Sequence, residues 1–383
     1  MKLDNFSIRL NKKQYYIVLS LLVLLGVVSL IAGMYNTWNN IVDFQQPAAC
    51  VFISGENPYL FHLEGKYGDN WSPPNYLHSL YFLLSPLCIF DDSTARLVWG
   101  FINIGFAIWI SYTLCKMANH REYFILVLLV FFASLSFRNG IGNQQNQMLV
   151  LAFFILSMQA NSSFFQGFFG ALSFLKYSFA GSWIGMFLYH NKYAVVWSVL
   201  LVIMMMISGA YWISSGNILI DLLGPFKVAS KIGNIAYGSG DILTIFEYLV
   251  GKEYEYRIIV AALLLLLNIV IVAFITKKST DPLFILSVAG VSALIFVTHL
   301  RYDAVFLLPA FIYFLSRSGI LSLIGFFIII YNWQITKILD IFKIHNASLN
   351  WTIIHLFLYV ILLVSLIFAE KHKDKKPLLI LEK

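Results

Sequence analysis

The sequence predicts an all-α fold, namely a polytopic membrane protein of about twelve transmembrane helices. Hydrophobic residues make up 60% of the 383 residues and charged residues only 12%, against roughly 45–50% and 25% in a soluble domain. Apolar runs recur from one end of the chain to the other, and about 20 such residues cross a bilayer as a helix. We therefore expect a single integral membrane domain over residues 1–383, without a separate soluble domain.

The first apolar run, from Tyr15 to Met34, resembles a signal peptide because Arg9, Lys12 and Lys13 precede it. It is too long for the apolar part of a signal peptide and has no small-residue cleavage site after it, so we expect an uncleaved first span. The expected spans are 14–34, 94–116, 121–137, 147–160, 164–175, 178–190, 193–214, 257–276, 282–298, 303–316, 320–335 and 350–369.

The apolar piece 76–90 is short, and we expect it to lie in the membrane interface. With that placement, fifteen of the 26 Lys and Arg residues fall on the cytoplasmic side, against six of the 19 Asp and Glu residues. Cytoplasmic loops collect Lys and Arg, so this placement is favoured. We expect the protein in the inner (plasma) membrane. Both termini, including the basic tail 370–383, then lie in the cytoplasm. The net charge of +7 then reflects topology and predicts no nucleic-acid partner.

Four polar segments share the outer side, facing the periplasm or cell exterior: 35–75, 138–146, 214–256 and 299–303. We expect the first outer loop, 35–92, to carry the chemistry and to contain interfacial helices. Three cysteines have no CxxC spacing, and we expect neither a disulfide framework nor a zinc site. HExxH and GxxxxGK[ST] motifs do not occur in the sequence, and no metal or cofactor is expected.

Asp43 follows the first span closely enough for the loop to fold it back onto the membrane helices. A carboxylate there can accept a proton from an acceptor hydroxyl, although a solvated loop acid or a helix N-cap would look the same in sequence. Gly55-Glu56-Asn57-Pro58-Tyr59 predicts a turn that ends a helix begun near Pro47. Pro73-Pro74 predicts the start of the interfacial helix.

Two basic positions interrupt apolar sequence. Lys176 lies within the apolar stretch 164–189, at the inner turn of an expected helical hairpin, where an unpaired ammonium is costly. A snorkelling lysine is the alternative. Arg301, flanked by His299 and Tyr302, lies between two spans and could bind phosphate oxygens with its planar fork of donors, or form a structural ion pair.

Carboxamides cluster at Asn143-Gln144-Gln145-Asn146, where an expected span begins. Such side chains can cap backbone groups or bind sugar hydroxyls, and the sequence leaves both roles open. Tyr59 and Trp71 could stack on sugar rings, while most other aromatic residues fit an interfacial belt.

Taken in order, these segments resemble the GT-C superfamily of membrane glycosyltransferases, specifically the bacterial family that includes the mycobacterial polyprenol-phosphate-mannose-dependent mannosyltransferases. The likeness covers nearly the whole chain, and its signal is the shared order and spacing of short motifs. The matching segments are Asp43-Phe44, Gly55-Glu56-Asn57-Pro58-Tyr59, Trp71-Ser72-Pro73-Pro74, Asn143-Gln144-Gln145-Asn146, Gly170 through Lys176, and His299 through Pro309.

The resemblance implies a metal-independent, inverting transfer of one sugar from a polyprenyl-phosphate donor in the membrane lipid to a glycan or glycolipid acceptor. It implies Asp43 as the catalytic general base. The residues it implies for the donor phosphate are Arg301, His299, Lys176 and Tyr302. Those it implies for the sugar or acceptor are Gln144, Asn146, Asn57, Tyr59 and Trp71.

Two other classes of protein fit the composition. A transporter or lipid-linked glycan flippase would have a similar number of spans, although the sequence has no evident internal repeat. A glycan polymerase or ligase would be expected to carry a larger outer loop late in the chain than 214–256.

Overall fold

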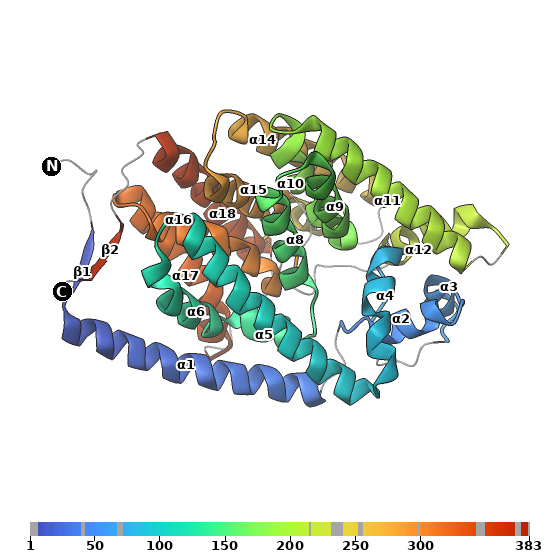
Figure 1. The fold of residues 1–383 in the computed structure, drawn as a ribbon, viewed down its shortest axis with the longest axis horizontal. Coiled ribbons are helices and arrows are strands. Elements are labelled where there is room, and N and C mark those ends of the chain that lie inside the picture. Colours follow the sequence, from blue (N-terminus) through green and yellow to red (C-terminus); the bar gives the residue numbers. More distant parts are fainter. Residues whose placement is uncertain are drawn as a thin grey trace. The chain divides into compact units, whose positions relative to one another are not determined.

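The computed structural model of the chain describes residues 7–39, 43–66, 72–213, 216–230, 240–251, 256–296, 299–341, 349–371 and 377–381. These residues are almost entirely helical (Figure 1). The chain forms two compact units that interleave along the sequence. The first comprises Met1–Ala32, Ala107–Asn139 and Asn234–Lys383, and the second comprises Gly33–Phe106 and Gly140–Gly233. Three helices continue from one unit into the other: α1 (Lys12–Asn39), α5 (Asp92–Met117) and α7 (Leu135–Gly142).

The predicted catalytic loop, 35–92, falls within the second unit. A disulfide-linked group of short helices is followed by a hairpin and a long apolar helix. Its other helices are α2 (Gln46–Ile53), α3 (Pro58–Leu63), α4 (His78–Leu84), η2 (Ser85–Ile89), α8 (Gln147–Gln159), α9 (Ser163–Ser173), η4 (Phe174–Lys176), α10 (Tyr177–Leu188), α11 (Lys192–Trp212) and α12 (Ile218–Ser230).

The first unit is built around α15 (Pro282–Phe296) and α16 (Leu308–Leu315), which are apolar and buried on every side. A helix that is hydrophobic all round belongs in a core, and these two form it. The surrounding elements are β1 (Ile8–Leu10), η3 (Arg121–Tyr123), α6 (Phe124–Phe132), α13 (Ile242–Val250), α14 (Arg257–Thr276), η6 (Arg301–Leu307), α17 (Ile320–Ile341), α18 (Leu349–Lys371) and β2 (Leu379–Leu381).

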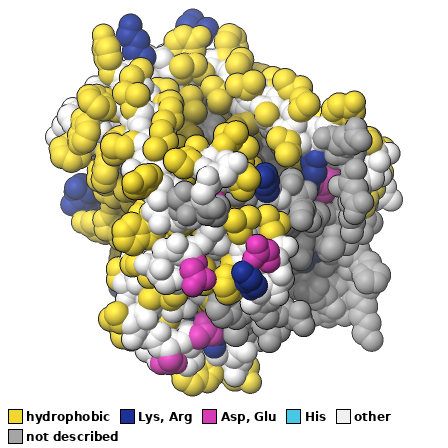
Figure 2. Space-filling view, turned by 90° about the vertical axis from the view of Figure 1, so that its right-hand side faces the viewer, with side chains coloured by type: hydrophobic (Ala, Val, Ile, Leu, Met, Phe, Trp, Pro, Cys, Tyr) yellow, Lys and Arg dark blue, Asp and Glu magenta, His cyan; other side chains and the backbone are white. Residues whose placement is uncertain are grey.

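Five described helices are long and apolar enough to cross a membrane: α1, α5, α11, α14 and α18. The bent pair formed by Arg121–Phe132 and Leu135–Gly142 would make a sixth. On α1, α11 and α14 many large apolar side chains are exposed, which suits helices surrounded by lipid. Figure 2 shows apolar side chains over much of the described surface, with Asp and Glu side chains gathered in its lower part. These features are consistent with a helical membrane protein.

The twelve predicted spans are not confirmed. Four further apolar helices, namely His78–Ile89, Gln147–Gln159, Pro282–Phe296 and Ile320–Gln334, are shorter than a full span. The predicted helix boundaries were closest where apolar runs are long, since α14 covers exactly the expected 257–276.

Other local predictions were wrong. The expected span 121–137 breaks after Phe132, where the chain bends by 65° into α7. Residues 138–142 are therefore helical and not part of a turn. Pro73-Pro74 lies before the helix and does not start it, since α4 begins at His78. The expected helix 303–316 begins as the 3-10 helix η6.

The two ends of the described chain lie together. β1 and β2 pair in parallel, with Ile8 opposite Leu379, and Figure 1 shows the two strands side by side. Tyr123 Oη donates a hydrogen bond of 2.5 Å to the Leu379 carbonyl, and the Leu378 N–H donates one of 3.0 Å to the Leu315 carbonyl. The segments that contain β1 and β2 are therefore neighbours in the fold.

Candidate active site

The predicted catalytic acid has a restrained backbone. Asp43 is half-buried and has a φ of 58°, in the left-handed region, which is uncommon for a residue other than glycine but is tolerated best by Asp and Asn. Its Oδ1 accepts a hydrogen bond of 3.3 Å from Ser72 Oγ. Gln45 reaches the same place, because its Nε2 donates to Ser72 Oγ over 3.1 Å and to the Pro73 carbonyl over 3.3 Å. Asp43 is therefore held against the chain that follows residue 71.

Tyr76, four residues after Ser72, contacts two other parts of the site. Its carbonyl accepts a hydrogen bond of 2.9 Å from Tyr59 Oη, and its own hydroxyl donates to Gln145 Oε1 over 3.4 Å. Ser72 and Tyr76 are separated by at most about 14 Å of extended chain. The segment Ser72–Tyr76 thus ties Asp43, α3 and the carboxamides to one another within the second unit.

Asn57 and Tyr59 have structural contacts in this arrangement. Asn57 is the N-cap of α3, since its Oδ1 accepts a hydrogen bond of 3.0 Å from the Tyr59 N–H. Its Nδ2 donates to Oδ1 of Asp221, a carboxylate fully buried in α12. The Tyr59 side chain is fully buried and packs edge-on against His78 at 5.1 Å between ring centroids. The remaining predicted sugar contact, Trp71, lies outside the described residues.

The carboxamide cluster begins α8 as a tight turn. Gln144 has a φ of 51°, its Nε2 donates to the Gly142 carbonyl over 2.6 Å, and the Trp99 indole N–H donates to the carbonyls of Gln144 and Gln145. The sequence left open whether these side chains cap α8. Asn146 occupies the N-cap position, yet its side chain accepts no backbone N–H there.

Several amide atoms of the turn have no hydrogen-bond partner. Within the described chain these are Gln144 Oε1, Gln145 Nε2, both amide atoms of Asn146 and both of Gln147, and all four side chains are at most 1% exposed. A buried polar atom without a partner costs about 1–3 kcal/mol. Unpaired groups at this density suggest a functional site more than a capping device.

Lys176 lies at the turn of a helical hairpin, as predicted. A Cβ placed on Gly170 of α9 would come within 2.1 Å of the Trp183 ring of α10, whereas thirteen residues of continuous helix would separate them by about 20 Å. Lys176 itself is half-buried, and its Nζ lies 5.3 Å from the centroid of the Phe179 ring. Leu77, next to Tyr76, belongs to the apolar cluster that includes Phe174 and Tyr177 on either side of Lys176.

A disulfide joins Cys50 of α2 to Cys88 of η2, with the two Cα atoms 5.6 Å apart. The prediction that the chain has no disulfide was therefore wrong, because the two residues are 38 apart in sequence and only folding brings them together. Gln46 adds a hydrogen bond of 3.4 Å to the Leu87 carbonyl. Both contacts fix the helices that flank Asp43 and the Ser72–Tyr76 segment.

The predicted phosphate ligand His299 belongs to the first unit, in a buried cluster of ionisable residues. Its Nδ1 lies 3.8 Å from Oδ2 of Asp241, and the Tyr359 ring packs against it at 5.7 Å. Asp241 is the N-cap of α13 and accepts hydrogen bonds of 2.8 Å from the N–H and Oγ1 of Thr244. Burial raises the pKa of the Asp241 carboxyl above its ordinary value, and the nearby His299 opposes that shift.

Arg301 and Tyr302 begin η6 in the same unit. The Arg301 carbonyl accepts a hydrogen bond of 3.0 Å from Ser136 Oγ of α7, and Tyr302 is buried. Asp303 Oδ2 accepts the Leu300 N–H over 2.9 Å, which fixes the start of η6. The turn predicted at 299–303 thus presents His299 and Arg301 from one short stretch of chain.

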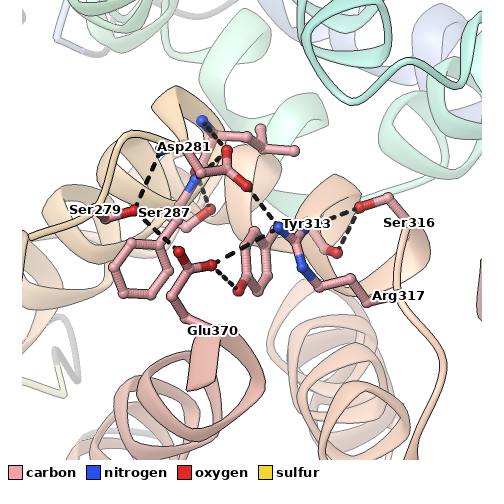
Figure 3. A network of polar contacts seen from close by, with 9 residues as sticks. Ser279, Asp281, Ser287, Tyr313, Ser316, Arg317 and Glu370 are labelled. Carbon is pink, nitrogen blue, oxygen red and sulfur yellow. Dashed lines mark hydrogen bonds and ion pairs between the residues drawn. The ribbon is translucent and has the colours of Figure 1, made fainter. Parts of the chain in front are cut away.

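A second polar network in the first unit joins three helix ends (Figure 3). Arg317 Nη2 lies 2.5 Å from Asp281 Oδ2 and 3.8 Å from Glu370 Oε2, with the guanidinium 3.7 Å from the Tyr313 ring centroid. Glu370 also accepts hydrogen bonds from Tyr313 Oη and Ser279 Oγ. Asp281, Arg317 and Glu370 are thus held together by ion pairs within the first unit.

The structure therefore brings together Asp43, Asn57, Tyr59 and the carboxamides through the Ser72–Tyr76 segment, and separately groups His299 with Arg301. Convergence of these two groups remains a prediction.

Sequence reasoning missed Asp221, Gln147, Asp241 and the pair His355 and Tyr359. Asp241 had a detectable signal, an Asp directly before an apolar run. An ionisable His355 inside a span was another. Comparison with protein-family models and with curated proteins gives no match for this chain.

Proposed function

We propose that this protein is a membrane glycosyltransferase of the GT-C type, which moves one sugar from a polyprenyl-phosphate donor to a glycan or glycolipid acceptor. The observation that supports this best is Asp43. It is an acid in a left-handed backbone conformation, held through Ser72 on the segment that also contacts the carboxamide turn. Backbone strain of this kind is found preferentially at functional sites. The order of sequence motifs around it supports the same activity.

In the proposed reaction Asp43 is the general base. It accepts the proton of an acceptor hydroxyl while that oxygen forms a bond to the anomeric carbon of the sugar. The bond from the anomeric carbon to the phosphate oxygen breaks on the opposite face, so the configuration inverts. The lipid phosphate leaves with one more negative charge. Arg301, His299, Lys176 and Tyr302 would stabilise that charge as preorganised donors. The transfer requires no metal ion and no cofactor.

The proposed orientation places the catalytic loop 35–92 outside the inner (plasma) membrane and both termini in the cytoplasm. The Cys50–Cys88 disulfide supports this placement, because disulfides persist in the periplasm and outside the cell and are rare in the cytosol. Arg9, Lys12 and Lys13 near β1 and Lys371 at the end of α18 also support it, because cytoplasmic segments collect Lys and Arg. Twelve spans remain part of this proposal, with the shorter apolar helices completing the bundle.

One observation favours a transporter or lipid-linked glycan flippase as the second candidate. The bend of 65° between α6 and α7 resembles the broken helices that form midplane sites in transporters. A glycan polymerase or ligase has no comparable support among the described residues.

The test is reconstitution of the purified chain in liposomes with polyprenyl phosphates that each carry one sugar, together with a glycan acceptor. We expect transfer of one sugar, with inverted configuration in the product and no loss of activity in a metal chelator. Movement of the lipid-linked sugar between leaflets, without transfer, would instead favour the flippase.

A further inference from the structure

Two side chains at the start of α8 carry unpartnered amides. Both amide atoms of Asn146 and both of Gln147 have no hydrogen-bond partner within the described chain. Each amide offers two N–H donors and two acceptor lone pairs. The start of α8 therefore has amide N–H donors and amide oxygen acceptors without hydrogen-bond partners on two adjacent residues.

The usual structural uses of these two side chains are excluded. Asn146 does not cap α8, although Asn at that position commonly does. The backbone hydrogen bonds of the turn do not involve these amides, since the Gln144 N–H donates to the Ile141 carbonyl and the Gln145 N–H to the Gly140 carbonyl. Removing the two amides would therefore break no hydrogen bond of the turn.

Gly140 leaves the space in which the Gln147 amide lies. A Cβ on Gly140 would come within 2.2 Å of Gln147 Nε2. Glycine inside a helix is otherwise unfavourable compared with alanine. Glycine at position 140 therefore lowers the helix propensity of α7, but it leaves room for the Gln147 amide.

We propose that Asn146 and Gln147 recognise hydroxyl groups of the substrate and contribute to the choice of sugar. This inference rests on the proposed function and extends it to the residue Gln147. Each sugar hydroxyl can donate and accept a hydrogen bond. A carboxamide donates from its nitrogen and accepts at its oxygen, so these two uncharged side chains are complementary to adjacent hydroxyls. The hydroxyls could belong to the donor sugar or to the acceptor glycan.

Access to the two amides requires a neighbouring segment to move, because both side chains are 1% exposed. Tyr76 is one such neighbour. Its hydrogen bond to Gln145 is 3.4 Å long, near the weak limit for such a bond. Displacement of Tyr76 would couple sugar entry to the segment that also contacts Asp43.

The test uses variants that remove the amides while keeping shape, namely Gln147→Met and Asn146→Leu. We expect unchanged or higher thermal stability, because unpaired buried polar atoms are lost, together with at least a tenfold lower kcat/KM for transfer. The matched control is Gln166→Met. The Gln166 amide is paired at both ends, to the Ala160 carbonyl and to Asn191, so this change should lower stability and leave the kinetics of the folded protein unchanged.

Gly140→Ala is a second, independent variant. It should displace the Gln147 amide and reproduce the kinetic loss without lowering stability. If these variants raise only the KM for the lipid-linked sugar, the hydroxyls belong to the donor. If they raise only the KM for the glycan, the hydroxyls belong to the acceptor.

A binding measurement separates this inference from the proposed function. Wild-type protein is titrated with a polyprenyl phosphate that carries one hexose, with the same lipid phosphate without sugar, and with the free glycan acceptor. We expect Gln147→Met to weaken binding of the hexose-bearing lipid or of the glycan, and to leave binding of the bare lipid phosphate unchanged. Equal affinities of wild type and variant for all three probes would overturn the inference. Absence of transfer by the wild-type protein would overturn the proposed function.

Discussion

Ser72 Oγ donates a hydrogen bond of 3.3 Å to Oδ1 of Asp43, whose backbone is in the left-handed region. The bond is long, and an anionic carboxylate has further acceptor capacity for an approaching hydroxyl. Ser72 thus orients the Asp43 carboxylate and leaves it able to accept a further hydrogen bond. The helices on either side of this pair are fixed by the Cys50–Cys88 disulfide.

Breaking that disulfide should destabilise the loop. Cys50→Ser, Cys88→Ser or a reducing agent should lower the free energy of unfolding by about 2–4 kcal/mol, because the bond links residues 38 apart in sequence. Thermal unfolding with and without reductant measures this. The buried thiol of Cys115 provides the control, since Cys115→Ser should leave the response to reductant intact. Equal stability of oxidised and reduced protein would show that the disulfide does not hold the loop.

Gly170→Ala should break the packing of the hairpin that carries Lys176. The added methyl group would overlap the Trp183 ring, which is fully buried and hydrogen-bonded to Ser157. Overpacking of this kind costs about 1–3 kcal/mol. Gly105→Ala is the control, because a Cβ there meets open space and alanine favours the helix. Similar unfolding temperatures for both variants would argue against the packing described here.

The Arg317 network should act on stability and not on catalysis. Arg317→Met leaves Asp281 and Glu370 without their cation, and we expect a loss of about 2–3 kcal/mol, below that of a fully buried pair. Arg317→Lys keeps the charge and should lose less, since lysine cannot reproduce the planar fork. Thermal unfolding and transfer rates per folded molecule separate the two effects. A selective loss of transfer in a fully stable Arg317→Met variant would contradict this role.

The buried Asp241 should make stability depend on pH. Burial raises the pKa of its carboxyl from the ordinary 3.8, so its folded form prefers the protonated state. The carboxyl therefore favours folding most at low pH, and that contribution is lost as the pH rises from 3.8 through the raised value. Asp241→Asn keeps the N-cap and should gain stability relative to wild type as the pH increases. A wild-type advantage that grows with pH would mean that the charge pair with His299 dominates.

The sequence allowed long apolar helices to be placed well, because a bilayer demands an uninterrupted run of apolar residues. α14 and α11 lie within two residues of their predicted ends. The break after Phe132 was missed because hydropathy does not record the angle between two helices. Pro73-Pro74 suggested a helix start, yet no helix begins before His78. Ser72 and Tyr76, in the non-helical segment before it, make tertiary contacts.

The sequence singled out Asp43, Lys176 and the carboxamides by residue type, and their catalytic and binding roles remain predictions. In the structure Asp43 and Gln145 make hydrogen bonds to Ser72 and Tyr76, and Leu77 packs with Phe174 and Tyr177, which flank Lys176. Cys50 with Cys88 and Asp241 with His299 were not predictable as pairs, because each pair is formed by folding. The unused amides of Asn146 and Gln147 likewise required a structure, since sequence alone does not reveal which atoms lack partners.

The most direct test of the account is sugar transfer by Asp43→Asn in liposomes supplied with donor and acceptor. Asparagine keeps the volume and tolerates the left-handed backbone, so the variant should fold normally while losing the proton acceptor. We expect transfer to fall by about 10²–10⁴-fold with an unchanged unfolding temperature, whereas Glu64→Gln, an exposed acid of the same loop, should retain full activity. Transfer by Asp43→Asn at the wild-type rate would contradict the assignment of Asp43 as the general base.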